Sequence, residues 1–560
     1  MSLPTSAPPS HDSTGIRIAA TWKPVSYLIP VVTAVLVAGC SVGPRYKQPV
    51  INLQPYHNAP EIDSRTATLP VPSLDRWWTG FNDPALAKIV ERALEQNLDL
   101  AASFARVEQA RAAAQEAGAN RKPSFDLNGR DTSSRQSVAT PIGRAVSGVF
   151  PGFNRDQNVL DLAASFARVA QARAAAQETG ANRKPSFDLV GSNTSSRQSV
   201  ATPLGRAVSG VIPGFNRNGN LLDLGIAASW ETDIFGGLRR GAEAANAEAQ
   251  AAEAERLGTR VSVVAEAADA YMQIRGAQVR LAFAKEQIET DEHLLRLVSQ
   301  RRSAGVASDR ELAQAEALLA QARATAPPLN NTLEAQLNRL DVLMGAQPGT
   351  NADELSPPKD IPAVPGVSNT LDAAELLRRR PDIIAAERRI AASNARIGQA
   401  IAEYYPKISL SGLLGSEAET PGSLFRESGF QPTLIAGLRW RLFDFGRVDA
   451  EVKRARGANA EALIQYRSSV LRATEDIEDA FNALAQSESR RDEIATGIVS
   501  LQRVKDLSEQ SYKAGVIPLT DVLDTNRQLL VAKDDLASTR ESAARAAVAS
   551  FRALGGGWSP

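Results

Sequence analysis

Two stretches of the chain alternate between apolar and polar or small side chains, which is the pattern of a strand with one buried face. They cover residues 222–230 and 434–442, and a weaker version follows Pro406 at residues 408–414. Each stretch is roughly the 9–11 residues that a tilted membrane strand needs. A half-buried sheet of a soluble protein shows the same alternation, so the pattern alone leaves both interpretations open.

Each of the two stronger stretches leads into a long segment with apolar positions at helical spacing and without proline. These segments are residues 237–302 and 446–513. At about 1.5 Å per residue, each predicts a helix of roughly 100 Å. Returning helices about half as long are expected at residues 308–343 and 518–554. None of these helices is apolar enough to cross a bilayer, so they are expected to pack side by side in water.

The same landmarks recur at one constant offset along the chain. Trp230 recurs as Trp440, and Ala304-Gly305-Val306 recurs as Ala514-Gly515-Val516, in both cases 210 residues later. One offset held throughout indicates two copies without a net insertion. The sequence therefore predicts two structural repeats, each with a helix, two strands, a long helix, a turn and a returning helix.

A second and much more recent duplication lies inside the first repeat. Residues 98–159 are nearly repeated as residues 160–221, so that Pro123 recurs as Pro185. Pro406 lies 34 residues before Trp440, which is close to the 45 residues between Pro185 and Trp230. The second repeat therefore has only one such unit. We expect the second copy, which leads directly into residues 222–230, to supply the helix and the strand. Residues 98–157 are then expected to lie outside the sheet.

The amino terminus has the features of a secreted lipoprotein. Apolar residues 27–37 follow Arg17 and Lys23 and end in small residues before Cys40, the only cysteine in the chain. A run of this length predicts a signal peptide at residues 1–39. Small residues before a cysteine resemble the bacterial lipobox, and Ser41 after it implies the outer membrane. The alternative is a plain signal peptide with a chance cysteine. Residues 40–80 are polar and rich in proline, which predicts an extended tether.

Composition argues against several other functions. The chain has 63 basic and 63 acidic residues without a basic stripe, so nucleic acid is not an expected partner. Its three histidines, at positions 11, 57 and 293, are far apart and have no cysteine companions. No metal site, cofactor or catalytic arrangement is therefore expected, and the chain is not expected to be an enzyme.

Four strands per chain cannot close a barrel, because about eight is the practical minimum. An open sheet edge is not tolerated in lipid. If the strands are membrane strands, several chains must share one barrel, and the long helices that continue from them would form a tube about 100 Å deep.

Several motifs make the chain similar to a known family. It resembles the outer-membrane lipoproteins of tripartite RND-type efflux systems, the NodT and OprM-like branch of the TolC family. The resemblance covers the chain from about Cys40 to its end and rests on these motifs: Gly43-Pro44-Arg45-Tyr46, Trp77-Trp78, Phe81-Asn82-Asp83-Pro84, Ser229-Trp230-Glu231, Asp233-Ile234-Phe235-Gly236, Arg379-Arg380-Pro381-Asp382, Phe443-Asp444-Phe445-Gly446-Arg447 and Leu554-Gly555-Gly556-Gly557-Trp558.

The resemblance implies an α+β membrane protein. Its fold would be a TolC-like homotrimer with a 12-stranded β-barrel in the outer membrane, continued by a long α-helical barrel in the periplasm. The first repeat would cover residues 81–349 and the second residues 371–556, joined by a linker at 350–370 and followed by a tail at 557–560. The implied partners are a periplasmic adaptor, an inner-membrane RND-type pump and outer-membrane lipid, and the implied function is a passive exit duct.

The resemblance also assigns roles to particular residues. The two turns, Ala304-Gly305-Val306 and Ala514-Gly515-Val516, correspond to tips that dock the adaptor, while their glycines alternatively only close helix hairpins. Tyr512, Asp521 and Asp524 resemble a periplasmic gate, although Ile517 stands near the place of the family's partner arginine. Three chains would turn each aspartate into a ring. Alternatively, Asp521 complements the helix dipole. Trp230 and Trp440 correspond to aromatic residues at the membrane interface.

Three other functions fit part of the pattern. A protein-secretion duct would need the same tube, and a periplasmic coiled-coil scaffold would need the helices but not the amphipathic strands. An envelope hydrolase would need a nucleophile and a base, which the sequence does not offer.

Overall fold

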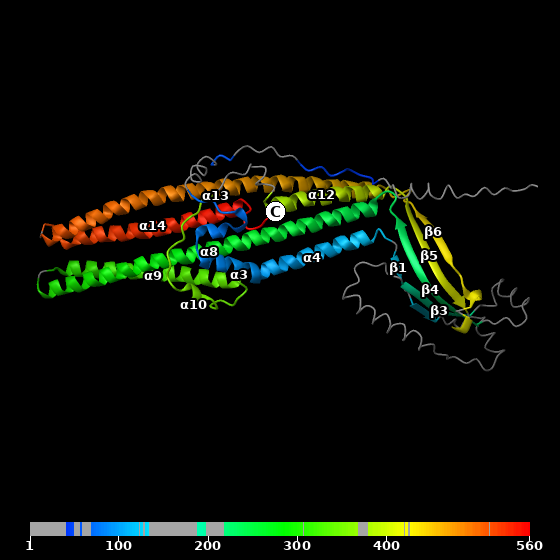
Figure 1. Cartoon of the computed structure of the whole chain (residues 1–560), viewed down its shortest axis with the longest axis horizontal. Helices are drawn as coiled ribbons and strands as arrows, with labels where there is room; N and C mark the ends of the chain where they lie inside the picture. The colour runs from blue at the N-terminus through cyan, green and yellow to red at the C-terminus, as the bar shows by residue number, and fades with distance from the viewer. Residues whose placement is uncertain are drawn as a thin grey trace, which may run out of the picture.

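The molecule has two parts, an elongated layer of helices and a curved sheet at one end of it (Figure 1). The computed structural model describes residues 41–49, 56–58, 69–122, 124–126, 129–133, 188–197, 218–305, 307–367, 379–418, 421–423, 426–514 and 516–559. Residues 1–39 and three predicted functional residues, Cys40, Val306 and Gly515, lie outside these ranges.

The helices come in pairs of equal length. The longest, α8 (Gly237–Ser303) and α13 (Arg447–Lys513), have 67 residues each, as the proline-free segments predicted. The returning helices α9 (Asp309–Leu343) and α14 (Leu519–Ala553) have 35 each. The helices before the sheet, α4 (Leu98–Ala119) and α12 (Pro381–Ala402), have 22 each. Shorter helices are η2 (Leu74–Phe81), α3 (Pro84–Gln96), α10 (Ala352–Leu355), η3 (Pro421–Ser423) and η4 (Glu427–Gly429).

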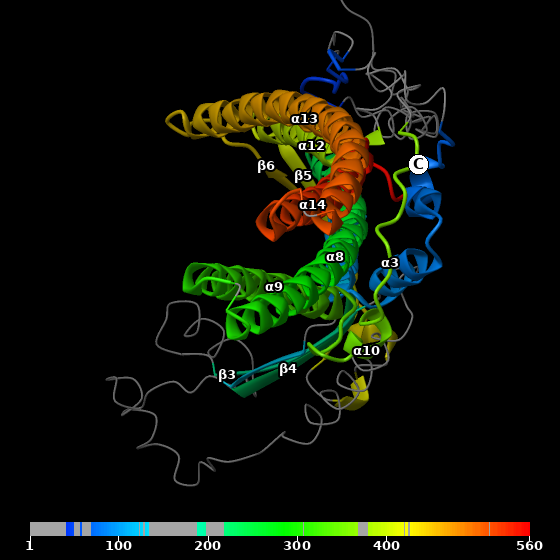
Figure 2. The same ribbon diagram turned by 90° about the vertical axis from the view of Figure 1, so that its left-hand side faces the viewer.

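Each long helix lies between shorter ones. Near the sheet, α8 packs between α4 and α12, and α12 in turn packs on α13. Toward the far end, α8 packs between α9 and α14, and α14 packs on α13. Viewed along the long axis, the helices form one curved layer that is open on its concave side, with α3 and α10 against its outer side (Figure 2). Among the described residues, no helix combines the length and the apolar character needed to cross a membrane.

A large core of buried residues holds the middle of the layer together. Trp77 and Trp78 in η2 are each 1% exposed, and the ring of Trp77 stacks on Phe551 of α14 with 5.0 Å between ring centroids. The N–H of Gly557 donates to the carbonyl of Leu74 at 2.8 Å, which ties the end of the chain to the same place. The core therefore joins the amino-terminal helices, the middle of α8 and the carboxyl terminus.

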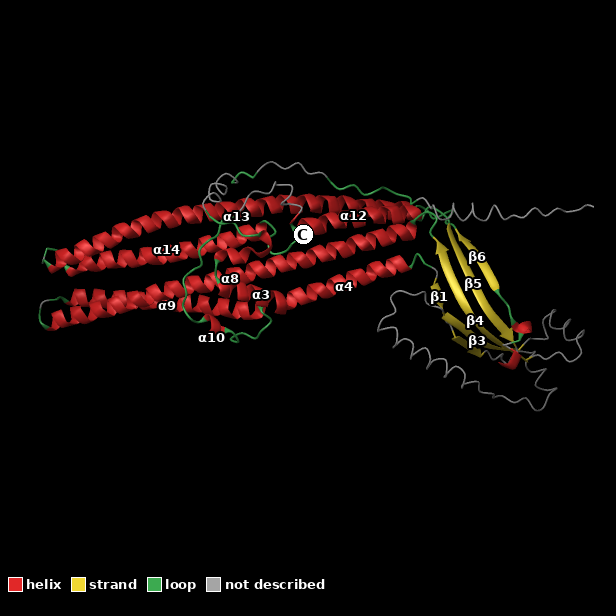
Figure 3. Cartoon of the chain, viewed as in Figure 1, coloured by secondary structure: helices red, strands yellow, loops and turns green. Residues whose placement is uncertain are grey.

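The strands form one sheet at the end of the helices (Figure 3). Its order is β2-β3-β4-β5-β6, and β1 pairs with β4 off this path. All pairings are antiparallel except that of β2 with β3. The strands are β1 (Ser124–Asp126), β2 (Gly129–Ser133), β3 (Asp188–Arg197), β4 (Asn218–Thr232), β5 (Lys407–Ala418) and β6 (Thr433–Arg439).

The structure corrects the expectation for the tandem duplication. The second copy supplies strand β3 as expected, but the first copy supplies the helix, α4. This helix packs on α8, where Arg111 pairs with Glu253 at 3.3 Å and the guanidinium of Arg256 lies 4.6 Å from the ring centre of Phe104. The expectation that residues 98–157 lie outside the sheet is therefore wrong for residues 124–126 and 129–133, which form its strands β1 and β2. Residues 98–119 also join the fold, as α4, while residues 134–187 lie outside the described ranges.

Chain connectivity explains why the first helix is used. Asn97 joins α3 to α4, and its side-chain oxygen accepts from the N–H of Leu100 at 2.9 Å as a helix N-cap. Its amide nitrogen donates to the carbonyl of Leu343 at the end of α9, also at 2.9 Å. Because α3 is fixed in the core, the helix that follows it directly starts in the correct place.

Candidate functional site

The two helix hairpins end in tight turns at the end of the molecule opposite the sheet (Figure 1). In the first, Gly305 has a φ of +73°, a left-handed conformation that favours glycine, and a Cβ there would meet nothing within 4 Å. Ser308 then starts α9 with a capping box. Its hydroxyl accepts from the N–H of Glu311 at 3.3 Å, and its own N–H donates to the Glu311 carboxylate at 2.6 Å. The bond from the Ser308 N–H, together with one that its hydroxyl donates to the same carboxylate at 3.1 Å, holds the pKa of Glu311 below its usual value.

The second turn is built differently at its helix start. Val516 is 75% exposed, and its N–H donates to the carbonyl of Ser511 at 2.9 Å. Pro518 stands where the first turn has Ser308, 210 residues earlier, and Asp521 stands where it has Glu311. Proline has neither a hydroxyl nor an N–H, so the capping box cannot form here. Among the described residues, Ala304, Gly305, Ala514 and Val516 therefore form the two exposed tips.

The predicted gate residues lie directly behind the second tip. Tyr512 is in the last turn of α13, Asp521 is in the first turn of α14, and Asp524 follows one turn later. The Asp524 carboxylate accepts from Arg527 at 2.8 Å and from Gln528 at 2.7 Å. These two hydrogen bonds lower the pKa of Asp524 from its usual value. Thr520 donates to the Asp521 carboxylate at 3.4 Å.

Two arginines that the sequence did not point to, Arg301 and Arg527, bind the predicted gate residues. Arg301, in the last turn of α8, donates to the Tyr512 hydroxyl at 3.5 Å. Leu523 of α14 packs on a small apolar cluster of Leu294, Val298 and Ala315 in the first hairpin. The structure thus brings the two hairpins together at their tips. Arg527 could have been found from its spacing of three residues from Asp524, but no local pattern connects Arg301 with Tyr512.

The two predicted interface tryptophans occupy matching places at the boundary between strands and helices. The indole N–H of Trp230 donates to the carbonyl of Arg121 at 3.2 Å, after α4. That of Trp440 donates to the carbonyl of Tyr404 at 3.0 Å, after α12. Both side chains are partly exposed, by 36% and 53%. Each indole therefore fastens the end of a strand to the end of the helix before the sheet.

The tether reaches the molecule at the same boundary. The N–H of Val42 donates to the carbonyl of Phe235 at 3.2 Å, and Arg240 donates back to the carbonyl of Val42 at 3.2 Å. Gly43 has a φ of +96°, and a Cβ there would lie 2.4 Å from the Cα of Gly398 in α12. The first described residues after Cys40 are thus held where the strands give way to the helices.

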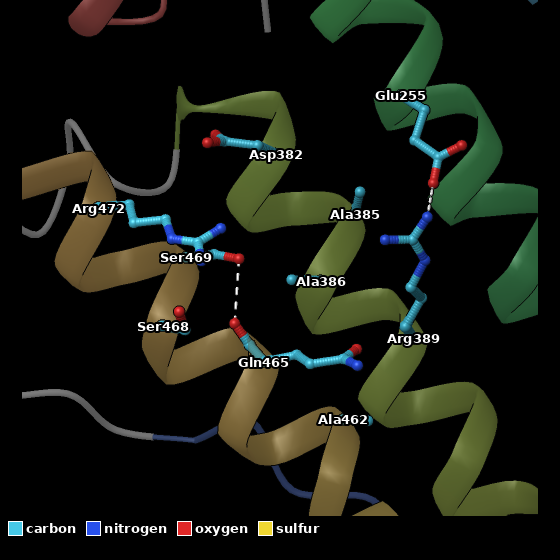
Figure 4. A pocket seen from close by; sticks show the side chains of 10 residues that line it. All are labelled: Glu255, Asp382, Ala385, Ala386, Arg389, Ala462, Gln465, Ser468, Ser469 and Arg472. Atoms are coloured by element: carbon cyan, nitrogen blue, oxygen red, sulfur yellow. Dashed lines mark hydrogen bonds and ion pairs between the residues drawn. The ribbon is translucent and has the colours of Figure 1, made fainter. Parts of the chain in front are cut away.

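A cavity of about 380 Å³ lies between α8, α12 and α13 (Figure 4). In it, Arg389 of α12 pairs with Glu255 of α8, and Asp382, Gln465 and Arg472 line other walls. This mixture of opposite charges joins helices and does not form a nucleophile–base pair. In the described part of the chain, no group of three or more His, Cys, Asp or Glu residues is placed to hold a metal ion.

Comparison with known proteins identifies the family. The family model described as "Outer membrane efflux protein" matches residues 154–346 and 373–556. The chain belongs to this family. The predicted resemblance is therefore confirmed, and the chain is an outer-membrane efflux channel of the NodT and OprM-like type.

Its relatives cover most of its length. It is 30% identical to the pyoverdine export outer membrane protein OpmQ of Pseudomonas putida, over 86% of this chain and 88% of that one. It is 26% identical to nodulation protein T of Rhizobium leguminosarum bv. trifolii, over 94% and 96%. The solved structure of the outer-membrane channel OprN has a TM-score of 0.73 and 29% identity, and the match covers 93% of this chain and all of OprN. The fold is therefore that of an outer-membrane channel.

Proposed function

We propose that three copies of this chain form one exit duct for small molecules, a 12-stranded barrel in the outer membrane continued by a helical tunnel through the periplasm. The observation that carries this proposal is the shape of the single chain. Its helices form one curved layer that is open on its concave side (Figure 2), and β2 and β6 at the two ends of the sheet pair with no further strand among the described residues. An open sheet is not tolerated in lipid, and copies that complete one another remove its edges.

The proposed membrane boundary lies at Trp230 and Trp440, where strands give way to helices. A Cβ on Gly236 would lie 2.8 Å from the Cα of Ser41, so the residue after Cys40 sits at this boundary. We propose that Cys40 is acylated and that the acyl chains enter the outer membrane beside the barrel. Several acyl chains on one cysteine give stable anchoring, which one chain does not.

At the other end, we propose that the two tips dock a periplasmic adaptor, which links the duct to an inner-membrane RND-type pump. Both tips are exposed in the single chain, as a docking surface requires. Behind them, Tyr512, Asp521 and Asp524 are proposed to form the gate. In three copies, each aspartate becomes a ring of carboxylates, which attracts cations and narrows the opening.

Native mass measurement of the detergent-extracted protein tests assembly and anchor together. We expect a trimer whose subunits are heavier than the polypeptide from Cys40 onward by the mass of the acyl chains. The Cys40→Ser variant is expected to form the same trimer without the added mass, because the proposed contacts between copies are made by the strands and helices. A monomer would contradict the shared duct, and an unmodified wild-type mass would contradict the anchor.

The gate assignment predicts that the cation selectivity of the channel depends on pH. Because Arg527 and Gln528 hold the pKa of Asp524 low, its ring stays charged as the pH falls to the usual range for aspartate and is neutralised only below it. Arg527→Met removes the main cause of this shift, so the pKa of Asp524 rises. Cation selectivity, measured as the reversal potential in a salt gradient, is expected to be lost at a higher pH in Arg527→Met than in the wild type. Identical pH profiles would show that Asp524 does not face the conduction path.

A further inference from the structure

The two halves of the sheet have the same register. In the first repeat, Asp188 of β3 faces Ala227 of β4. The corresponding residues of the second repeat, 221 and 210 positions later, are Ser409 and Gly437, and they also face each other. The hairpins β3-β4 and β5-β6 therefore correspond residue by residue.

A third pairing joins the two hairpins and has no counterpart among the strands that the structure describes. Strand β4 of the first repeat pairs antiparallel with β5 of the second, from Leu222 opposite Ala418 to Thr232 opposite Ile408. By the correspondence of the hairpins, β6 matches β4 and β3 matches β5. Strand β6 lies at one end of the sheet and β3 lies next to the other end, so these two strands cannot pair within one molecule. Only a second copy of the chain can supply this partner.

The observed register can be transferred to this missing pairing. Leu224 faces Ser416, Ile226 faces Leu414 and Ala228 faces Gly412. Adding 210 to each β4 residue and subtracting 221 from each β5 residue gives three pairs between copies. They are Leu434 with Ser195, Ala436 with Asn193, and Leu438 with Gly191. Strand β6 offers an edge for such a partner, because it is the last strand of the described sheet and pairs on one side only, with β5.

In the single chain, this edge of β3 is already occupied. Strand β2 pairs with it in parallel, from Gly129 opposite Gly191 to Ser133 opposite Ser195. Every pair joins a residue of the first copy of the duplication to its own counterpart 62 positions later. The covered residues, 191–195, are those that the transferred register assigns to β6 of a second copy. One strand edge accepts only one neighbour, because each of its N–H and C=O groups is used once.

The chain between the two copies can be removed without a change of register. Strand β1 ends with Asp126 opposite Ala227, and β3 begins with Asp188 opposite the same Ala227. Asp126 and Asp188 are equivalent residues of the two copies. A chain in which Phe125 is followed directly by Asp188 therefore continues from α4 into β3 as one unbroken strand.

We propose that β2 is a covering strand: it occupies the edge of β3 onto which β6 of a second copy docks, and it must leave before copies can join. The inference rests on the proposed assembly of several copies and adds the residues that meet and the segment that competes. A parallel pair of five residues is expected to yield to the longer antiparallel strand β6, because parallel pairing is less stable per residue. The duplication therefore acts as a built-in competitor of assembly.

Disulfide trapping tests the register and the competition. Ala436→Cys with Asn193→Cys places two cysteines directly opposite each other across the proposed junction, within the Cα separation that a disulfide needs. The matched control is Ala436→Cys with Thr194→Cys, whose side chains lie on opposite faces of the sheet. The single variant Ala436→Cys shows whether the new cysteine forms a disulfide with Cys40. Each set is made in the full chain and in a chain lacking residues 126–187, and oligomers are counted on non-reducing gels.

We expect strong cross-linking between copies for the Asn193 pair in the shortened chain, severalfold less in the full chain, and little for the Thr194 control. Arg130→Pro with Asp131→Pro removes the N–H that β2 donates to β3 and should raise the yield in the full chain without any deletion. This variant covers the case in which the shortened chain does not fold.

Equal yields with and without β2 would overturn the competition, and cross-linking of the control pair in place of the Asn193 pair would overturn the register. A trimer by native mass that forms no Asn193 cross-link counts against the strand junction alone. A cross-linked trimer that carries no ions across a bilayer counts against the duct alone.

Discussion

Replacing Asp521 and Asp524 together by alanine is expected to raise the single-channel conductance of the protein in planar bilayers severalfold. The substitution removes two proposed rings of carboxylates at the periplasmic mouth, together with the bond between Asp524 and Arg527. Side chains that narrow an opening limit its conductance more than those in the wide part of a tube. The measurement is the current step per inserted channel at fixed voltage and salt.

A comparison of the two hairpins shows that Asp521 and Glu311 have different surroundings. Glu311 occupies in the first hairpin the place of Asp521 in the second, and it is engaged in the capping box with Ser308. Asp521 has no such role, because Pro518 replaces the serine. Its carboxylate is therefore not held in a capping box. Its place in the first turn of α14 also fits the alternative that it complements the helix dipole, so the conductance measurement decides between the two roles.

Glu311→Ala is accordingly the matched control for the conductance experiment. It removes a carboxylate at the equivalent position of the other hairpin, where the carboxylate accepts from the N–H of Ser308 in the capping box. We expect its conductance to equal that of the wild type. Unchanged conductance in the aspartate variant, or an equal rise in both variants, would remove Asp521 and Asp524 from the gate.

The sequence was sufficient to predict the helices and most of the sheet, because their periodicity is local. Residues 237–302 without proline became α8, and the alternation around Trp440 marked β6. The positions of the tips followed from two glycine turns. Each of these features depends on residues close together in the chain, where spacing alone determines which face is buried.

The duplication shows where such reasoning ends. Residues 98–119 and their second copy have nearly the same sequence, so neither periodicity nor propensity can tell which one packs on α8. The choice is made by Asn97, which fixes the first helix to the end of α9. Likewise, the contact between Arg301 and Tyr512 joins residues from two different hairpins and exists only because those hairpins pack together.

Trp77→Ala is expected to cause the largest loss of stability among single substitutions in the helical part, about 3–5 kcal/mol. The side chain is 1% exposed, stacks on Phe551 and meets Trp78 and Phe81 edge to face, with ring centroids 5.9 Å and 6.2 Å away. Its removal leaves a cavity where η2, α8 and the end of α14 meet. The checks are the temperature at which the helical circular dichroism signal is lost and the fraction of protein recovered in the membrane.

Trp77→Phe is the matched control, because it keeps an aromatic ring against Phe551 and loses only part of the buried area. Its loss of stability is expected to be well below that of Trp77→Ala. Phe104→Ala serves as a second control, since Phe104 is 51% exposed and its ring lies against the guanidinium of Arg256 at the surface. If Trp77→Ala melted like Phe104→Ala, the core around η2 would not hold the helices together, and the tether motif Trp77-Trp78 would need another role. The expected difference instead means that η2 joins the amino-terminal helices, α8 and the end of α14 in one core, which stabilises the helical layer at its middle.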